Sequence, residues 1–220
     1  MDVIEAESGP NPRATILILH GLGADGNDFV PMAQELDLQS VGPVRFLFPH
    51  APVMPVTING GYRMRAWYDI IGFDADAPQD EAGLRRSQAA VDALLQRELE
   101  RGIAADRIVL AGFSQGCAMA LLAGLRFGER LAGIVGLSGY LPLAAKTAAE
   151  RTEANRDTPI FLAHGTQDEV VALDRAHASR DALQDLGYRV DWHEYPMGHS
   201  VSPREITDLN AWLVQALSAA

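Results

Sequence analysis

Short apolar runs recur along the chain, and amphipathic stretches separate them. The runs are continuous rather than alternating and are rich in Val, Ile and Leu, which is typical of strands buried on both faces of a sheet. We predict five such strands, at residues 15–19, 44–48, 107–111, 133–137 and 159–163. A sixth run, at residues 189–195, alternates more and is predicted to lie at an edge of the sheet.

Helical periodicity occupies the intervals between these runs. The predicted helices cover residues 27–36, 80–100, 115–125, 173–186 and 203–217. Pro203 suits the first turn of the last helix, with Ser202 as its candidate N-cap. Because strands alternate with helices, we predict a single α/β domain over residues 1–220, with a mostly parallel central sheet and helices on both faces.

Two segments do not follow this alternation, residues 49–77 and residues 139–158. The first is rich in Gly and Pro and also carries several Met and aromatic residues. Long loops in compact domains are usually functional or disordered, and the aromatic content argues against disorder. We therefore interpret residues 49–77 as part of a binding surface.

Composition narrows the class of protein further. The 220 residues are 48% hydrophobic and 21% charged, which excludes a disordered chain, and the net charge is −11 without a basic stripe. Nucleic acid is therefore not an expected partner. A single cysteine, Cys117, excludes an internal disulfide. We see no signal peptide or run long enough to span a membrane, and expect a cytoplasmic protein.

Residues 112–116 read Gly-Phe-Ser-Gln-Gly and match the G-x-S-x-G pattern of a nucleophile elbow. The motif follows a predicted strand and precedes an apolar helix, the context that such an elbow requires. The alternative is a glycine-rich helix start chosen only for close packing. We favour Ser114 as a nucleophile, held on a tight turn above the positive end of a helix.

A serine hydroxyl needs a base to accept its proton, and the base needs an orienting acid. In proteins with this elbow the chain order is Ser, then Asp or Glu, then His. His199 follows the last predicted strand, whereas His164 ends a strand and His193 lies within one, where structural roles are expected. Asp168 follows the strand at 159–163. We predict that Asp168 holds the tautomer of His199.

Residues 21–26 read Gly-Leu-Gly-Ala-Asp-Gly and fit a dinucleotide-binding loop as well as an oxyanion loop. The dinucleotide interpretation needs a carboxylate at the end of the second strand, and residues 48–52 contain none. Asp25 and Asp28 would also repel a pyrophosphate. We favour an oxyanion hole formed by the backbone N–H groups of Leu22 and Gln115.

These motifs together resemble the phospholipase/carboxylesterase branch of the α/β-hydrolases, which includes bacterial carboxylesterases and acyl-protein thioesterases. The stretches that carry the resemblance are residues 20–23, 55–62, 66–69, 112–116, 138–142, 164–168 and 197–200. They span nearly the whole chain in the order of the family. Two positions depart from the family pattern: Cys117 replaces a usual glycine and Ala172 a usual proline.

The resemblance implies an α/β-hydrolase fold, the triad Ser114, Asp168 and His199, and Leu22 and Gln115 as oxyanion donors. It implies a serine carboxylesterase that hydrolyses small-molecule carboxylic esters of small to medium apolar acyl groups through an acyl-enzyme. An acyl-thioesterase or lysophospholipase with the same triad is the alternative. A non-catalytic binding protein of the same fold is a further alternative. Neither a cofactor nor a metal is expected, and a homodimer is compatible with the resemblance.

Candidate substrate-binding residues cluster in the irregular segment at residues 49–77. We predict an apolar acyl groove lined by Met64, Trp67, Tyr68, Ile70 and Phe73. The alternative is that these side chains only cover the edge of the sheet.

Overall fold

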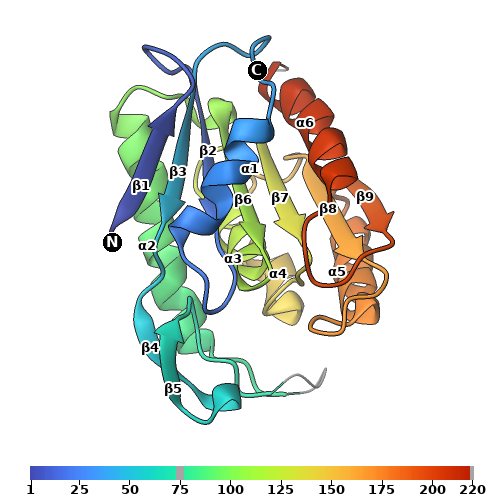
Figure 1. The fold of residues 1–220 in the computed structure, drawn as a ribbon. Helices are drawn as coiled ribbons and strands as arrows, with labels where there is room; N and C mark the ends of the chain where they lie inside the picture. The colour runs from blue at the N-terminus through green and yellow to red at the C-terminus, as the bar shows by residue number, and fades with distance from the viewer. Residues whose placement is uncertain (73–76, 219–220) are drawn as a thin grey trace.

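A seven-stranded sheet, antiparallel only at β1, forms the centre of the computed structural model, which describes residues 1–72 and 77–218 (Figure 1). The strand order is β1-β3-β2-β6-β7-β8-β9. The bounds are β1 Val3–Glu7, β2 Ala14–Leu19, β3 Val44–Pro49, β6 Ile108–Phe113, β7 Gly133–Leu137, β8 Ile160–Gly165 and β9 Val190–Tyr195. The predicted sheet is confirmed, with β9 at an edge.

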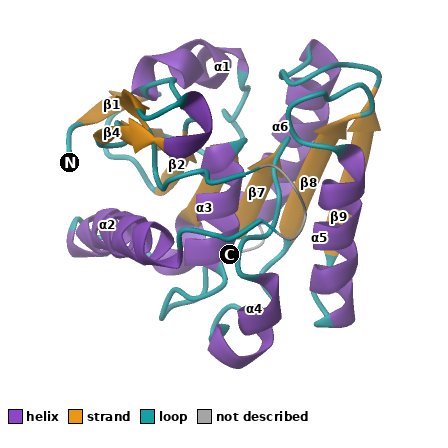
Figure 2. Cartoon of the chain, turned by 90° about the horizontal axis from the view of Figure 1, so that it is seen from below, coloured by secondary structure: helices purple, strands orange, loops and turns teal. Residues whose placement is uncertain are grey.

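Helices cover both faces of the sheet, as Figure 2 shows. Their bounds are α1 Val30–Glu35, α2 Glu81–Glu100, α3 Gln115–Gly124, α4 Ala144–Glu150, α5 Leu173–Asp185 and α6 Pro203–Ser218. Side chains of α2, α3 and α5 pack on one face, and those of α1 and α6 pack on the other. Successive residues of β2, such as Ile16 and Leu17, enter opposite cores, which explains its continuous apolar sequence.

The two irregular segments contain elements that were not predicted. A hairpin of β4 (Val53–Val56) and β5 (Tyr62–Arg65) projects beyond the main sheet (Figure 1). Gly60 and Gly61 make its turn with positive φ angles of 64° and 79°. The segment at 139–158 contains α4, and the predicted helix at 27–36 is divided into a 3₁₀ turn, η1 (Gly26–Phe29), and α1.

Parallel strands bring their carboxyl ends to one edge of the sheet. Ser114 follows β6, Asp168 follows β8 and His199 follows β9, so all three lie at this edge. The loop at residues 20–25 follows β2 and lies at the same edge. The topology therefore gathers the predicted site residues from distant parts of the chain.

Candidate active site

Ser114 lies on a sharp turn between β6 and α3, with φ 55° and ψ −117°. A non-glycine residue with positive φ is strained and persists only where its surroundings fix it. A side chain at Gly112 would overlap the carbonyl of Gly116, and one at Gly116 would overlap the carbonyl of Leu19. Both glycines are therefore needed for the close packing of the turn.

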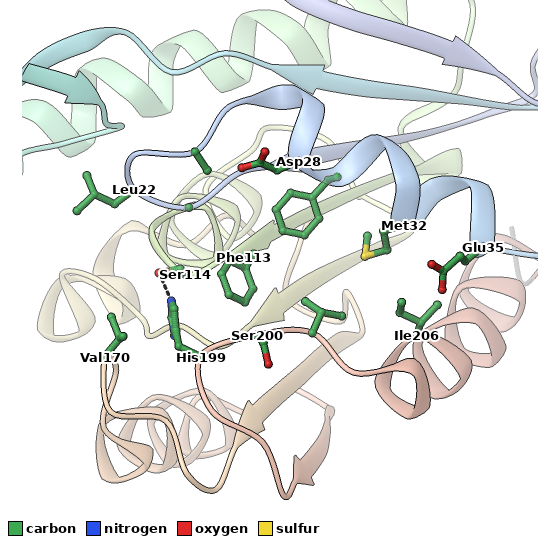
Figure 3. Close-up of a pocket in the computed structure, with 14 residues that line it drawn as sticks. Leu22, Asp28, Met32, Glu35, Phe113, Ser114, Val170, His199, Ser200 and Ile206 are labelled. Atoms are coloured by element: carbon green, nitrogen blue, oxygen red, sulfur yellow. Dashed lines mark hydrogen bonds between the residues drawn. The ribbon is translucent and has the colours of Figure 1, made fainter.

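Ser114, His199 and Asp168 form a continuous hydrogen-bonded chain (Figure 3). The Nε2 atom of His199 lies 2.9 Å from the Oγ atom of Ser114. Its Nδ1 atom lies 2.7 Å from the Oδ2 atom of Asp168. The Asp168 side chain is buried, and that of His199 is 17% exposed. The Nε2 atom of His199 can therefore transfer a proton between Ser114 and a reacting group while Nδ1 stays bound to the Asp168 carboxylate.

The Asp168 carboxylate is held by backbone groups of its own turn. Its Oδ1 atom accepts hydrogen bonds from the N–H groups of Val170, at 2.8 Å, and Val171, at 2.9 Å. This leaves Oδ2 directed at His199. The Nε2 atom of His164 lies 3.4 Å from Oδ2 but donates to the carbonyl of Val171 at 2.8 Å. Burial lowers the pKa of His164 and favours its neutral form, in keeping with the structural role expected from the sequence.

A capping box positions the loop that carries His199. The Ser202 hydroxyl accepts from the N–H of Glu205 at 3.2 Å, and the Glu205 carboxylate accepts from the N–H of Ser202 at 3.2 Å. The predicted N-cap is thus confirmed. Glu205 is fully buried, and burial raises the pKa of its carboxyl to about 7. The sequence carried a signal for Glu205, the S-x-x-E spacing, but none for its burial.

The two predicted oxyanion donors lie beside Ser114. Leu22 lines the same cavity as Ser114 and His199, and Gln115 is the first residue of α3. Within the part of the chain that the structure describes, neither backbone N–H donates a hydrogen bond. The loop of Leu22 is fixed by a hydrogen bond of 2.9 Å from the N–H of Gly23 to the carbonyl of Arg65.

The side chain of Gln115 makes two hydrogen bonds that the sequence did not reveal. It accepts from the N–H of Trp67 at 2.8 Å and donates to the carbonyl of Tyr68 at 2.8 Å. The indole N–H of Trp67 donates to the carbonyl of His20 at 2.9 Å. The Nε2 atom of His20 in turn accepts from the N–H of Ala51. This buried network joins the loop of Leu22 to the segment after β5.

Among the described residues, those predicted for the acyl groove do not line the cavity beside Ser114. Trp67 and Tyr68 are core side chains, only 1% and 3% exposed. Met64 and Ile70 are half-buried, and neither lines the cavity beside Ser114. Phe73 lies outside the described residues. For Trp67 and Tyr68, this placement favours the alternative that they cover the sheet, because their hydrogen bonds fix them inside the protein.

An apolar cavity of about 490 Å³ begins at Ser114 and His199. Figure 3 shows Phe113, Met32 and Ile206 along it, with Leu22 and Val170 on the other side of the serine. The volume is within the usual range of small-molecule sites. The site can therefore hold an apolar group next to a candidate nucleophile.

Other kinds of site find little support in the described residues. They contain no group of three or more His, Cys, Asp or Glu side chains placed to hold a metal ion. No helix among them is long and apolar enough to cross a membrane. Cys117 is buried, and burial raises the pKa of its thiol to about 12, which disfavours the reactive thiolate.

Known proteins of one family resemble this chain over nearly its whole length. The model of the phospholipase/carboxylesterase family matches residues 1–217. Acyl-protein thioesterase 1 of Yarrowia lipolytica is 42% identical over 205 residues, which cover 91% of this chain and 90% of that protein. The protein of the same name from Neurospora crassa is 42% identical over 213 residues, covering 93% and 87%.

Solved structures show the same fold. Arabidopsis thaliana SOBER1 superposes with a TM-score of 0.89 at 31% identity, covering 93% of this chain and 99% of that one. Acyl-protein thioesterase 2 of Zea mays superposes with a TM-score of 0.86 at 31% identity, covering 97% and 99%. The similarity thus extends over nearly the whole chain.

Proposed function

Since the chain belongs to the phospholipase/carboxylesterase family of α/β-hydrolases, a family of hydrolases, we propose that it cleaves acyl esters and thioesters through an acyl-enzyme on Ser114. One observation carries the proposal. The Ser114 Oγ, the imidazole of His199 and the Asp168 carboxylate are joined by contacts of 2.9 and 2.7 Å. That arrangement converts a weak nucleophile into a strong one.

In the first half-reaction, Nε2 of His199 accepts the Ser114 proton as Oγ bonds to the carbonyl carbon of the substrate. The negative charge on the carbonyl oxygen is stabilised by the N–H groups of Leu22 and Gln115. The bond from carbon to the leaving oxygen or sulfur then breaks. His199 gives its proton to the leaving group, and the acyl group stays on Ser114.

In the second half-reaction, water takes the place of the leaving group. His199 accepts a proton from the water as its oxygen bonds to the acyl carbon, and then returns the proton to Ser114. The free acid departs and the enzyme is regenerated. Asp168 keeps the proton of the neutral imidazole on Nδ1, so that Nε2 is free to accept.

The leaving group is the finer part of the proposal. The sequence favoured a carboxylic ester, with a thioester as the alternative, and both react through the same steps. Relatives named acyl-protein thioesterase 1 support the thioester. We propose that the enzyme accepts both, with thioesters as the better substrates.

Turnover of matched acyl esters and acyl thioesters by wild type and Ser114→Ala tests this proposal. We expect wild type to cleave both and the variant to lose about four or more orders of magnitude in kcat. A fluorophosphonate should label wild type stoichiometrically at Ser114. As a control, Cys117→Ala should keep its turnover, because that thiol is buried. Full activity of Ser114→Ala, or an absence of both turnover and labelling, would contradict the proposal.

A further inference from the structure

We propose that His20 is a positioning residue for the oxyanion hole, because it holds the peptide group that carries the N–H of Leu22. The side chain of His20 is fully buried, directly after β2 and two residues before Leu22. It acts through the backbone of this loop rather than by contact with the substrate. The inference rests on the proposed function, in which the Leu22 N–H donates to the carbonyl oxygen of the substrate.

The partners of the two ring nitrogens fix where His20 carries its proton. The N–H of Ala51 lies 3.0 Å from Nε2, and a backbone N–H can only donate. Nε2 therefore accepts and carries no proton. The proton of the neutral ring is then on Nδ1, which lies 2.7 Å from the carbonyl oxygen of Gly21 and donates to it.

The surroundings of the His20 ring keep it in this neutral form. Burial lowers the pKa of His20 by more than its hydrogen bond to the Gly21 carbonyl raises it. A proton added at Nε2 would also face the N–H of Ala51, so that two donors would oppose each other. The ring therefore keeps a single N–H, and that N–H is directed at Gly21.

The hydrogen bond from His20 determines the direction of the Leu22 N–H. The Gly21 carbonyl and the Leu22 N–H belong to one planar trans peptide, so they point in opposite directions. A donor that holds the carbonyl on one side therefore turns the N–H to the other side. The N–H of Ala24 also donates to this carbonyl, at 3.3 Å, but the contact from His20 is shorter. A hydrogen bond at the carbonyl also polarises the peptide and strengthens its N–H as a donor.

The same peptide lies next to the nucleophile. A side chain added at Gly21 would lie 3.3 Å from the Cβ atom of Ser114, and Leu22 lines the cavity at Ser114. Trp67 holds His20 from the protein interior. Its indole N–H donates to the His20 carbonyl at 2.9 Å, and its ring packs on the imidazole with centroids 5.3 Å apart. The imidazole is thus fixed, and it can fix the Leu22 N–H relative to Ser114.

Two substitutions separate the two contacts of the His20 ring. The NH₂ group of Asn lies about where Nδ1 lies in His, so His20→Asn keeps a donor for the Gly21 carbonyl. The longer Gln reaches the position of Nε2, so His20→Gln keeps an acceptor for Ala51 and loses the donor. We expect His20→Asn to keep kcat within about fivefold of wild type. His20→Gln should lower kcat for an acyl ester about thirtyfold or more at nearly constant KM, because a lost oxyanion donor costs about 10²–10³.

A thiono ester, in which sulfur replaces the carbonyl oxygen, distinguishes positioning from a general loss of structure. Sulfur accepts hydrogen bonds weakly, so an intact oxyanion hole favours the oxygen ester over the thiono ester. The ratio of kcat/KM for the two esters should fall about tenfold or more in His20→Gln and stay within about twofold in His20→Asn. A variant with fewer correctly folded molecules would lower both rates alike and leave the ratio unchanged.

His50→Gln is the matched control. His50 lies in the same region, but its Nδ1 atom accepts from the N–H of Gly26 at 3.1 Å. This substitution should leave the ratio of the two esters unchanged. The inference fails if His20→Gln keeps the wild-type ratio, if His20→Asn loses as much as His20→Gln, or if His50→Gln lowers the ratio to the same extent.

Nitrogen-15 NMR of wild type gives a test that needs no variant to fold. The His20 signals, identified by their proximity to the ring protons of Trp67, should show a protonated Nδ1 and an unprotonated Nε2 at neutral pH. The opposite tautomer, or a doubly protonated ring, overturns the inference. Wild-type turnover with an unchanged ester ratio in His20→Gln overturns this inference alone. Absence of wild-type turnover for every ester overturns the proposed function and the inference together.

Discussion

At the scale of single residues, the chemistry depends on which partners the two carboxylate oxygens of Asp168 contact. Oδ1 is occupied by the N–H groups of Val170 and Val171, and Oδ2 faces Nδ1 of His199. The backbone therefore fixes which oxygen meets the histidine. A carboxylate can accept hydrogen bonds at both oxygens, so Asp168 can bind the backbone and His199 at the same time.

Asp168→Asn tests whether Oδ2 of Asp168 must accept the proton that His199 carries on Nδ1. The amide oxygen should stay on the two backbone N–H groups, which turns the NH₂ group toward Nδ1 of His199. The imidazole must then accept at Nδ1 and carry its proton on Nε2, where it cannot take the Ser114 proton. We expect kcat for an acyl ester to fall by about 10⁴ with little change in fold.

The adjacent, exposed Glu169 supplies the matched control for this substitution. Glu169→Gln removes the same charge from the same turn and should stay within twofold of wild type. An Asp168→Asn variant that kept more than a tenth of wild-type kcat would show that the carboxylate does not set the tautomer.

At the scale of elements, the start of α6 sets the position of the His199 loop. Glu205 closes the capping box with Ser202 through Oε2. Its Oε1 atom is buried without a hydrogen-bond partner among the described residues. A buried carboxyl in this position favours the protonated form, so the helix start is sensitive to pH.

The pKa of Glu205 rises from an ordinary value of about 4.5 to about 7 in the folded protein. Between these pH values the folded state holds a proton that the unfolded chain has released, so the contribution of Glu205 to stability is lost as pH rises. Such a shift corresponds to roughly 3 kcal/mol. Glu205→Gln removes this titration. We expect the free energy of unfolding of Glu205→Gln, relative to wild type, to be higher at pH 8 than at pH 5.

Urea unfolding of both proteins at the two pH values measures this difference. Comparison with wild type cancels the contribution of other buried carboxyls, such as Asp92, whose pKa burial raises to about 6. A difference between the two proteins that did not change with pH would contradict the proposed titration of Glu205.

At the scale of the whole molecule, the parallel sheet and the elbow could be predicted because local sequence marks them. Strands such as β2 and β7 are buried on both faces and leave continuous apolar runs. The elbow has no room for side chains at Gly112 and Gly116, so it can be recognised from the two glycines that flank Ser114. The positions of Asp168 and His199 followed from the shared edge of parallel strands.

What escaped prediction depends on contacts between distant segments. β1, which was not predicted, is an exception, because its alternating apolar and charged residues are a local strand signal. It pairs with β3, about forty residues further along the chain. The bonds of Gln115 to Trp67 and Tyr68 join residues nearly fifty positions apart, so no local pattern reveals them. The apolar cavity has the same origin, since α1 and α6 come from opposite ends of the chain.

The most direct test of the account is the mass of the enzyme during turnover. Wild type would be mixed with an acyl thioester, quenched in acid within milliseconds, and mapped by peptide mass spectrometry. We expect an acyl group on Ser114 that disappears as the substrate is consumed and never forms in Ser114→Ala. An acyl group on another residue, or turnover without any adduct, would contradict it.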